Sequence, residues 1–87
     1  ENKLNRNFVC KNWESAVKFI NDITPIVESI NHHPDIQLTN YRDINITIYT
    51  HSCNGLTEID FELAKLIEAM TDIEYSPKWR REHINSV

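Results

Sequence analysis

Residues 44–50 read Ile-Asn-Ile-Thr-Ile-Tyr-Thr, and the three isoleucines alternate with more polar side chains. Alternation with a period of two is typical of a β-strand that buries one face and exposes the other. The same parity places His51 on the face of Tyr49. Residues 36–38 also alternate, and the turn-like residues 40–43 separate the two segments. The pattern therefore predicts a β-hairpin built from these two strands.

An amphipathic helix is predicted on each side of this hairpin in the sequence. The first covers residues 13–30, with Asn12 as its N-cap, because apolar residues recur there at three- and four-residue steps. Pro25 has no N–H to donate to the carbonyl four residues back, so we expect a kink or a local break there. The second helix follows Thr57, with Asp60 three residues on as its capping-box partner. The apolar residues of the two stripes are Trp13, Ala16, Val17, Ile20, Ile23, Val27 and Ile30, then Ile59, Leu63, Leu66, Ile67 and Met70.

The ends of the chain complete the predicted fold. Residues 3–11 carry apolar side chains at even positions and predict a further strand, and Pro77 begins either a short helix or a tail. The order strand, helix, strand, strand, helix predicts an α+β fold with helices packed on one face of an antiparallel sheet. We expect one domain over residues 1–75 and a C-terminal extension over residues 76–87.

The composition excludes several classes of function. Of the 87 residues, 40% are hydrophobic and 25% are charged, as in ordinary globular domains. Thirteen acidic and nine basic residues give a net charge of −4, which argues against a large nucleic-acid surface. No apolar run is long enough to span a bilayer, and no signal peptide is visible. The single glycine, Gly55, excludes glycine-rich phosphate loops, while Cys10 and Cys53 are too few for a disulfide framework.

Three of the four histidines, His32, His33 and His51, surround the predicted hairpin. Imidazole titrates near physiological pH and therefore exchanges protons or binds metals. Adjacent histidines in an extended segment point to opposite sides, and no zinc-type spacing follows, so metal binding is disfavoured. Cys53 lies two residues from His51, but nothing marks it as an activated thiol. Glu28 precedes His32 by four residues and would orient that imidazole if the helix continued to it.

General acid–base catalysis without a cofactor is the chemistry that this set favours. One imidazole would donate a proton to a leaving group while another accepts a proton elsewhere on the substrate. A purely structural role is the alternative, because a His-His-Pro run also ends a helix, where a cationic imidazole complements the helix dipole. The residue types alone leave both readings open, and His83 in the tail fits only the structural one.

The full spacing of these residues resembles the signature of the pterin-4a-carbinolamine dehydratases. The resemblance covers about Phe8 to Met70. It rests on rare residues at fixed separations, which are Glu28, His32-His33-Pro34, Tyr41, His51 and Asp60, and on the flanking stretches Ile46 to His51 and Gly55 to Asp60.

The resemblance implies a cofactor-free lyase without a metal. Members remove water from 4a-hydroxytetrahydrobiopterin and give a quinonoid dihydropterin, a step in tetrahydrobiopterin recycling. The implied acid–base pair is His32 and His51, with His33 mainly placing the substrate and Glu28 supporting His32. The implied pterin-binding residues are Asn31, His32, His33, Tyr49, Thr50, His51 and Ser52.

The resemblance also implies an assembly and an alternative function. The family fold is a sheet of about four strands with helices on one side, assembled as a homodimer or homotetramer. Some members instead act as dimerisation cofactors for a transcription factor, so a protein partner in the nucleus is the alternative to a cytoplasmic enzyme. The sequence departs from the pattern at Asn31, where an aspartate is common, and at Ile36, where an aromatic is frequent. The usual N-terminal helix and most of the first strand have no counterpart here.

Overall fold

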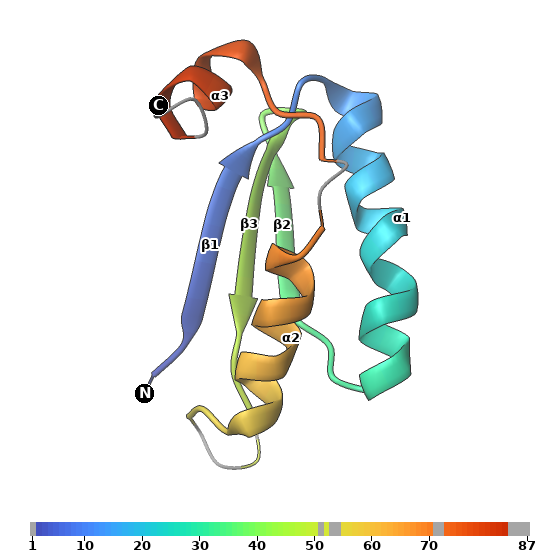
Figure 1. Ribbon diagram of the computed structural model, residues 1–87, viewed down its shortest axis with the longest axis vertical. Coiled ribbons are helices and arrows are strands. Elements are labelled where there is room, and N and C mark those ends of the chain that lie inside the picture. Colours follow the sequence, from blue (N-terminus) through green and yellow to red (C-terminus); the bar gives the residue numbers. More distant parts are fainter. Residues whose placement is uncertain (1, 51, 53–54, 71–72, 84–87) are drawn as a thin grey trace.

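The computed structural model describes residues 2–50, 52, 55–70 and 73–83. Within them, three antiparallel strands form a sheet in the order β1-β3-β2, with bounds Leu4–Val9 for β1, Asp35–Thr39 for β2 and Asp43–Ile48 for β3. In the register, Ile46 of β3 lies opposite Arg6 of β1 and Ile36 of β2. The predicted hairpin is therefore confirmed, and its second strand is the centre of the sheet (Figure 1).

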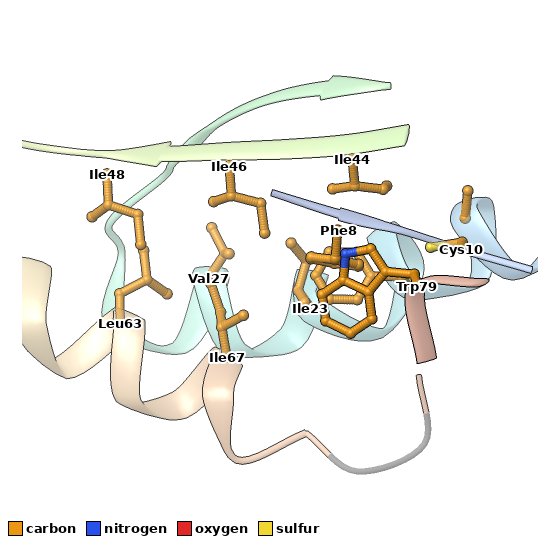
Figure 2. Packing of buried hydrophobic residues seen from close by; sticks show 12 residues of the cluster. Phe8, Cys10, Ile23, Val27, Ile44, Ile46, Ile48, Leu63, Ile67 and Trp79 are labelled. Carbon is orange, nitrogen blue, oxygen red and sulfur yellow. The ribbon is translucent and has the colours of Figure 1, made fainter. Parts of the chain in front are cut away.

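The helices cover one face of this sheet. Helices α1 (Trp13–Ile30) and α2 (Glu58–Glu68) pack on the face that carries the isoleucines of β3 (Figure 2). The predicted α+β class is confirmed, with three described strands where the resemblance implies about four. Within the described residues no helix is both long and apolar enough to cross a bilayer. The core consists of Phe8, Cys10, Ala16, Phe19, Ile23, Val27, Ile44, Ile46, Ile48, Leu63, Ile67 and Trp79.

Helix α1 begins and ends where the periodicity predicted. The Asn12 side chain accepts a hydrogen bond from the Ser15 N–H, and the Ser15 hydroxyl in turn accepts from the Asn12 N–H, both at 2.9 Å. The sequence predicted a kink or a local break at Pro25. The break is wrong, because the helix runs through Pro25 without interruption, and the kink stays a prediction. Pro25 and Asn21, whose carbonyl loses its helical donor, are both exposed, so water can hydrogen-bond that carbonyl.

Two members of the predicted apolar stripes are exposed. Trp13 is 55% exposed and Leu66 is 37% exposed, whereas Phe19, which the predicted stripe omitted, is buried. The buried side of α1 is centred on Phe19 and Ile23, and Trp13 lies about a quarter turn away from that line. The periodicity therefore predicted the bounds of α1 correctly, but it included the exposed Trp13 in the buried face and omitted the buried Phe19.

The C-terminal segment packs against the end of strand β1. Tyr75 forms an isolated antiparallel bridge with Cys10, just beyond the end of β1. Helix α3 (Pro77–His83) follows, with the Ser76 hydroxyl accepting a hydrogen bond from the Trp79 N–H at 3.1 Å. The sequence predicted either a short helix or a tail from Pro77, and the structure contains the helix. Its Trp79 side chain is buried against Phe8.

Candidate active site

Three segments that are distant in the sequence meet at one end of the molecule. The last turn of α1, the chain that follows β3 and the first turn of α2 all lie at the lower end of Figure 1. His32 follows α1, Thr50 follows β3 and Asp60 lies in the first turn of α2. The signature residue Tyr41 is in the β2–β3 turn, at the opposite end of the sheet. The structure therefore brings only part of the predicted signature into this site.

Asn31 ends α1 and directs His32 away from it. Asn31 has the left-handed backbone conformation, with φ 51° and ψ 44°, which asparagine tolerates better than most residues. Its N–H donates to the Glu28 carbonyl, and the His32 N–H donates to the Val27 carbonyl, both at 3.3 Å. This pair of bonds is the Schellman arrangement that closes a helix. Because α1 ends at Ile30, His32 does not lie on the helix face that carries Glu28.

His32 reaches a fully buried carboxylate. Its Nε2 lies 2.6 Å from Oδ1 of Asp60, which is 0% exposed, while the His32 side chain is 16% exposed. The other carboxylate oxygen, Oδ2, accepts hydrogen bonds from the Thr50 hydroxyl at 2.6 Å and from the Thr57 N–H at 2.8 Å. The Thr57 contact belongs to the predicted capping box of α2, which is confirmed. One carboxylate thus joins the three segments of the site.

These contacts keep Asp60 ionised. Burial by itself raises the pKa of a carboxyl group, but the hydrogen bonds from Thr50, His32 and the Thr57 N–H more than offset it. The pKa of Asp60 is therefore lowered from its ordinary value of 3.8. Its position in the first turn of α2 adds the favourable end of the helix dipole. The anionic carboxylate can accept a hydrogen bond from Nε2 of His32.

The predicted support of His32 by Glu28 is wrong. Glu28 Oε2 lies 2.9 Å from Nε2 of His33 instead, and both side chains are more than half exposed. The expectation required α1 to continue to His32, and the left-handed Asn31 prevents this. The carboxylate that contacts His32 is Asp60. The sequence analysis assigned Asp60 only to the cap of the second helix and to the end of the signature.

The remaining predicted binding residues are close to His32 or Thr50 in the sequence. Asn31 and Ser52 are exposed, and Tyr49 is partly buried with the Lys3 ammonium 4.4 Å from its ring centroid. The Thr50 hydroxyl is engaged with Asp60. His51 lies outside the residues that the structure describes.

An open groove of about 170 Å³ lies beside His33, between α1 and β2. His33, Glu28 and Pro34 form part of its lining, and His32 does not. The two adjacent histidines therefore contact different elements, His32 the start of α2 and His33 the last turn of α1. Across the described part of the chain, no three histidine, cysteine or acidic side chains gather closely enough to hold a metal ion.

Comparison with known proteins identifies the family. The sequence profile described as "Pterin 4 alpha carbinolamine dehydratase" matches residues 1–70. The chain belongs to this dehydratase family. The family resemblance seen in the histidine spacing is thereby confirmed, and the C-terminal helix α3 lies beyond the matched residues.

Relatives from this dehydratase family match most of the chain. A Sulfolobus acidocaldarius protein that bears the family name is 44% identical over 66 residues, which cover 76% of this chain and 71% of that protein. Pterin-4-alpha-carbinolamine dehydratase 2, mitochondrial, from Arabidopsis thaliana is 38% identical over 68 residues, covering 78% of this chain and 36% of that protein. The crystal structure of a transcriptional coactivator/pterin dehydratase from Brucella melitensis matches with a TM-score of 0.70 at 31% identity, covering 77% of this chain and 70% of that one.

Proposed function

We propose that this protein dehydrates 4a-hydroxytetrahydrobiopterin to quinonoid dihydropterin, as a step of tetrahydrobiopterin recycling. The observation that carries the proposal is the 2.6 Å contact between His32 and the buried carboxylate of Asp60, in a chain of the dehydratase family. A fixed imidazole with an ionised partner is suited to proton transfer at neutral pH. Such a site requires neither a metal nor an organic cofactor.

The reaction requires one proton donor and one proton acceptor. The C4a–O bond breaks, and the hydroxyl group takes up a proton and leaves as water. The N5–H bond breaks, its proton passes to a base, and a C4a=N5 double bond forms. We assign His32 and His51 as this acid–base pair and His33 to placement of the pterin.

Glu28 has a modified role in this proposal. Because it contacts His33 rather than His32, it would orient the substrate-placing histidine. The apolar groove beside these two residues is a candidate surface for the flat pterin ring. Asn31, Tyr49, Thr50 and Ser52 remain proposed contributors to pterin binding.

The test is a dehydration assay with freshly generated 4a-hydroxytetrahydrobiopterin, measured against the uncatalysed rate. His32→Ala and His51→Ala are each expected to lower kcat by about 10²- to 10⁴-fold, the usual contribution of a general acid or base. His83→Ala is the matched control, since α3 lies at the other end of the molecule, and it is expected to keep wild-type activity. Full activity in both site variants would show that the assignment is wrong, and an inert wild-type protein would refute the function itself.

A second candidate function comes from the Brucella melitensis protein, whose crystal structure is described as a transcriptional coactivator/pterin dehydratase. By this analogy, the chain would bind the dimerisation helices of a transcription factor as a protein-binding coactivator. A protein that is inert toward carbinolamine pterins but binds such a helical partner would favour this alternative over catalysis.

A further inference from the structure

Asp60 holds more of the site together than the contact with His32 alone. The Thr50 and Thr57 hydroxyl oxygens lie 3.0 Å from each other and 2.6 and 3.3 Å from Asp60 Oδ2. With the Thr57 N–H and His32, these groups surround a carboxylate that has no exposed surface. A buried charge with this many donors is fixed in orientation as well as stabilised.

We propose that Asp60 is a positioning residue that holds the proton of His32 on Nε2, so that Nδ1 is the nitrogen that exchanges a proton with the pterin. The inference deepens the proposed dehydratase function and rests on it. Thr50 belongs to the same device, since its hydroxyl donates the shortest bond to Oδ2. The hydroxyl of Thr50 acts on the reaction through Asp60, and any contact of Thr50 with the pterin comes from another part of the residue.

The choice of nitrogen follows from the chemistry of the two groups. An ionised carboxylate can only accept hydrogen bonds, so at 2.6 Å from Oδ1 the Nε2 atom must carry its hydrogen. This holds for the neutral imidazole and for the imidazolium. The two protonation states of His32 then differ only at Nδ1. Proton transfer to or from the substrate takes place there, while Nε2 remains bonded to Asp60.

Thr50 links this device to the second proposed catalytic histidine. It immediately precedes His51 in the sequence, and its backbone N–H and carbonyl both bond to Gly55, at 2.8 and 3.3 Å. The hydroxyl bond to Asp60 therefore anchors the residue to which His51 is covalently attached.

The tautomer of His32 is measured directly by ¹⁵N NMR of the imidazole ring in the wild-type protein. The expected result is a protonated Nε2 and an unprotonated Nδ1 in the neutral form. Asp60→Asn replaces the obligate acceptor by an amide that both donates and accepts, so the preference for Nε2–H is expected to weaken. A neutral His32 with its hydrogen on Nδ1 in the wild type would overturn the proposal. Because this measurement needs no substrate, it remains decisive even if the protein proves not to be a dehydratase.

Two substitutions at Thr50 test the positioning role without removing the charge. Thr50→Val keeps the shape but loses the hydroxyl, and it is expected to lower kcat about tenfold with little change in KM. Thr50→Ser keeps the hydroxyl and is expected to restore most of kcat. Thr39→Val, at the other end of the sheet, is the matched control.

Three outcomes at Thr50 would contradict the proposal. They are an unchanged kcat in Thr50→Val, an equal loss in Thr50→Ser, and a rise in KM without a loss of kcat. The last would show that the hydroxyl binds the pterin directly. If Asp60→Asn does not fold, the Thr50 variants and the wild-type tautomer still decide the matter.

Discussion

A buried carboxylate whose pKa is lowered makes stability depend on pH. Folding lowers the pKa of Asp60 below 3.8, so the folded state favours the ionised form relative to the unfolded chain. The resulting stabilisation is fully present above about pH 4, the unfolded value, and is lost as the pH falls through the folded value. Asp60 thus makes the active-site end of the molecule acid-sensitive.

The prediction is that the free energy of unfolding of the wild type falls below pH 4, in part because Asp60 becomes protonated. Asp60→Asn is expected to be less stable by about 1–3 kcal/mol at pH 7, because buried donors lose their ionic acceptor. The gap between the two proteins should narrow on acidification. Urea denaturation from pH 7 to pH 2 measures this, and a gap that stays constant with pH would contradict it.

Cys10 presents the opposite case, a thiol held in its neutral form. Burial raises the pKa of Cys10 to about 11, and the nearby negative charge of Asp43 adds to the shift. The thiolate is the reactive species, so the folded protein should leave Cys10 almost unlabelled by a disulfide reagent at pH 8. The Cys53→Ser variant isolates this thiol for measurement. Rapid labelling without denaturant would show that Cys10 is accessible in the folded state.

Among the elements, α1 affects the site through the residue that ends it. Asn31 takes a left-handed conformation, as does Asn40 in the β2–β3 turn at the other end of the sheet. A β-branched side chain is poorly tolerated in this conformation, whereas glycine is not. The two asparagines therefore form a matched pair for separating stability from activity.

Asn31→Val and Asn40→Val are each expected to lower the free energy of unfolding by about 1–2 kcal/mol. Only Asn31→Val should also lower dehydratase activity, because it displaces His32 from Asp60. The glycine variants at both positions should have a free energy of unfolding close to that of the wild type. Thermal denaturation and the dehydration assay together measure this. An equal loss of activity at Asn31 and Asn40 would argue against the role of the helix end.

The elements could be predicted from the sequence because their signals are local. The isoleucine alternation of β3 and the periodicity of α1 depend on residues a few positions apart, and both elements were confirmed. The contact between His32 and Asp60 joins residues 28 positions apart, so no local pattern contains it. The sequence predicted that Glu28 contacts His32, but Glu28 contacts His33. The left-handed conformation of Asn31 causes this change, because it ends α1 before His32.

At the scale of the whole molecule, the sheet has two edges, β1 and β2. A chain of 87 residues buries a modest core, and association would cover further apolar surface. Together with the family resemblance, this predicts a homodimer or homotetramer. Light scattering of the purified protein at micromolar concentration measures its mass, and a monomer alone would contradict the expected assembly.

Helix α3 is the part of the molecule that lies beyond the family match, and it completes the core. The Trp79 ring stacks on Tyr75, with 4.3 Å between their centroids. It also lies edge-on to Phe8, with 6.4 Å between the centroids (Figure 2). Trp79 is 8% exposed, so its side chain fills space against β1 that solvent would otherwise reach. The core of this chain therefore includes a residue that lies beyond the part matched by the family profile.

Trp79→Ala is expected to lower the free energy of unfolding by about 3–5 kcal/mol, the usual range for removing a buried tryptophan. Lys78→Ala, the exposed neighbour in the same helix, is the control and should change it by less than about 0.5 kcal/mol. Because α3 and the site lie at opposite ends of the molecule, the variant that remains folded in the cold should keep its activity per folded molecule. Urea denaturation followed by circular dichroism measures the stability. An equal free energy of unfolding in the Trp79 and Lys78 variants would show that the core is complete without α3.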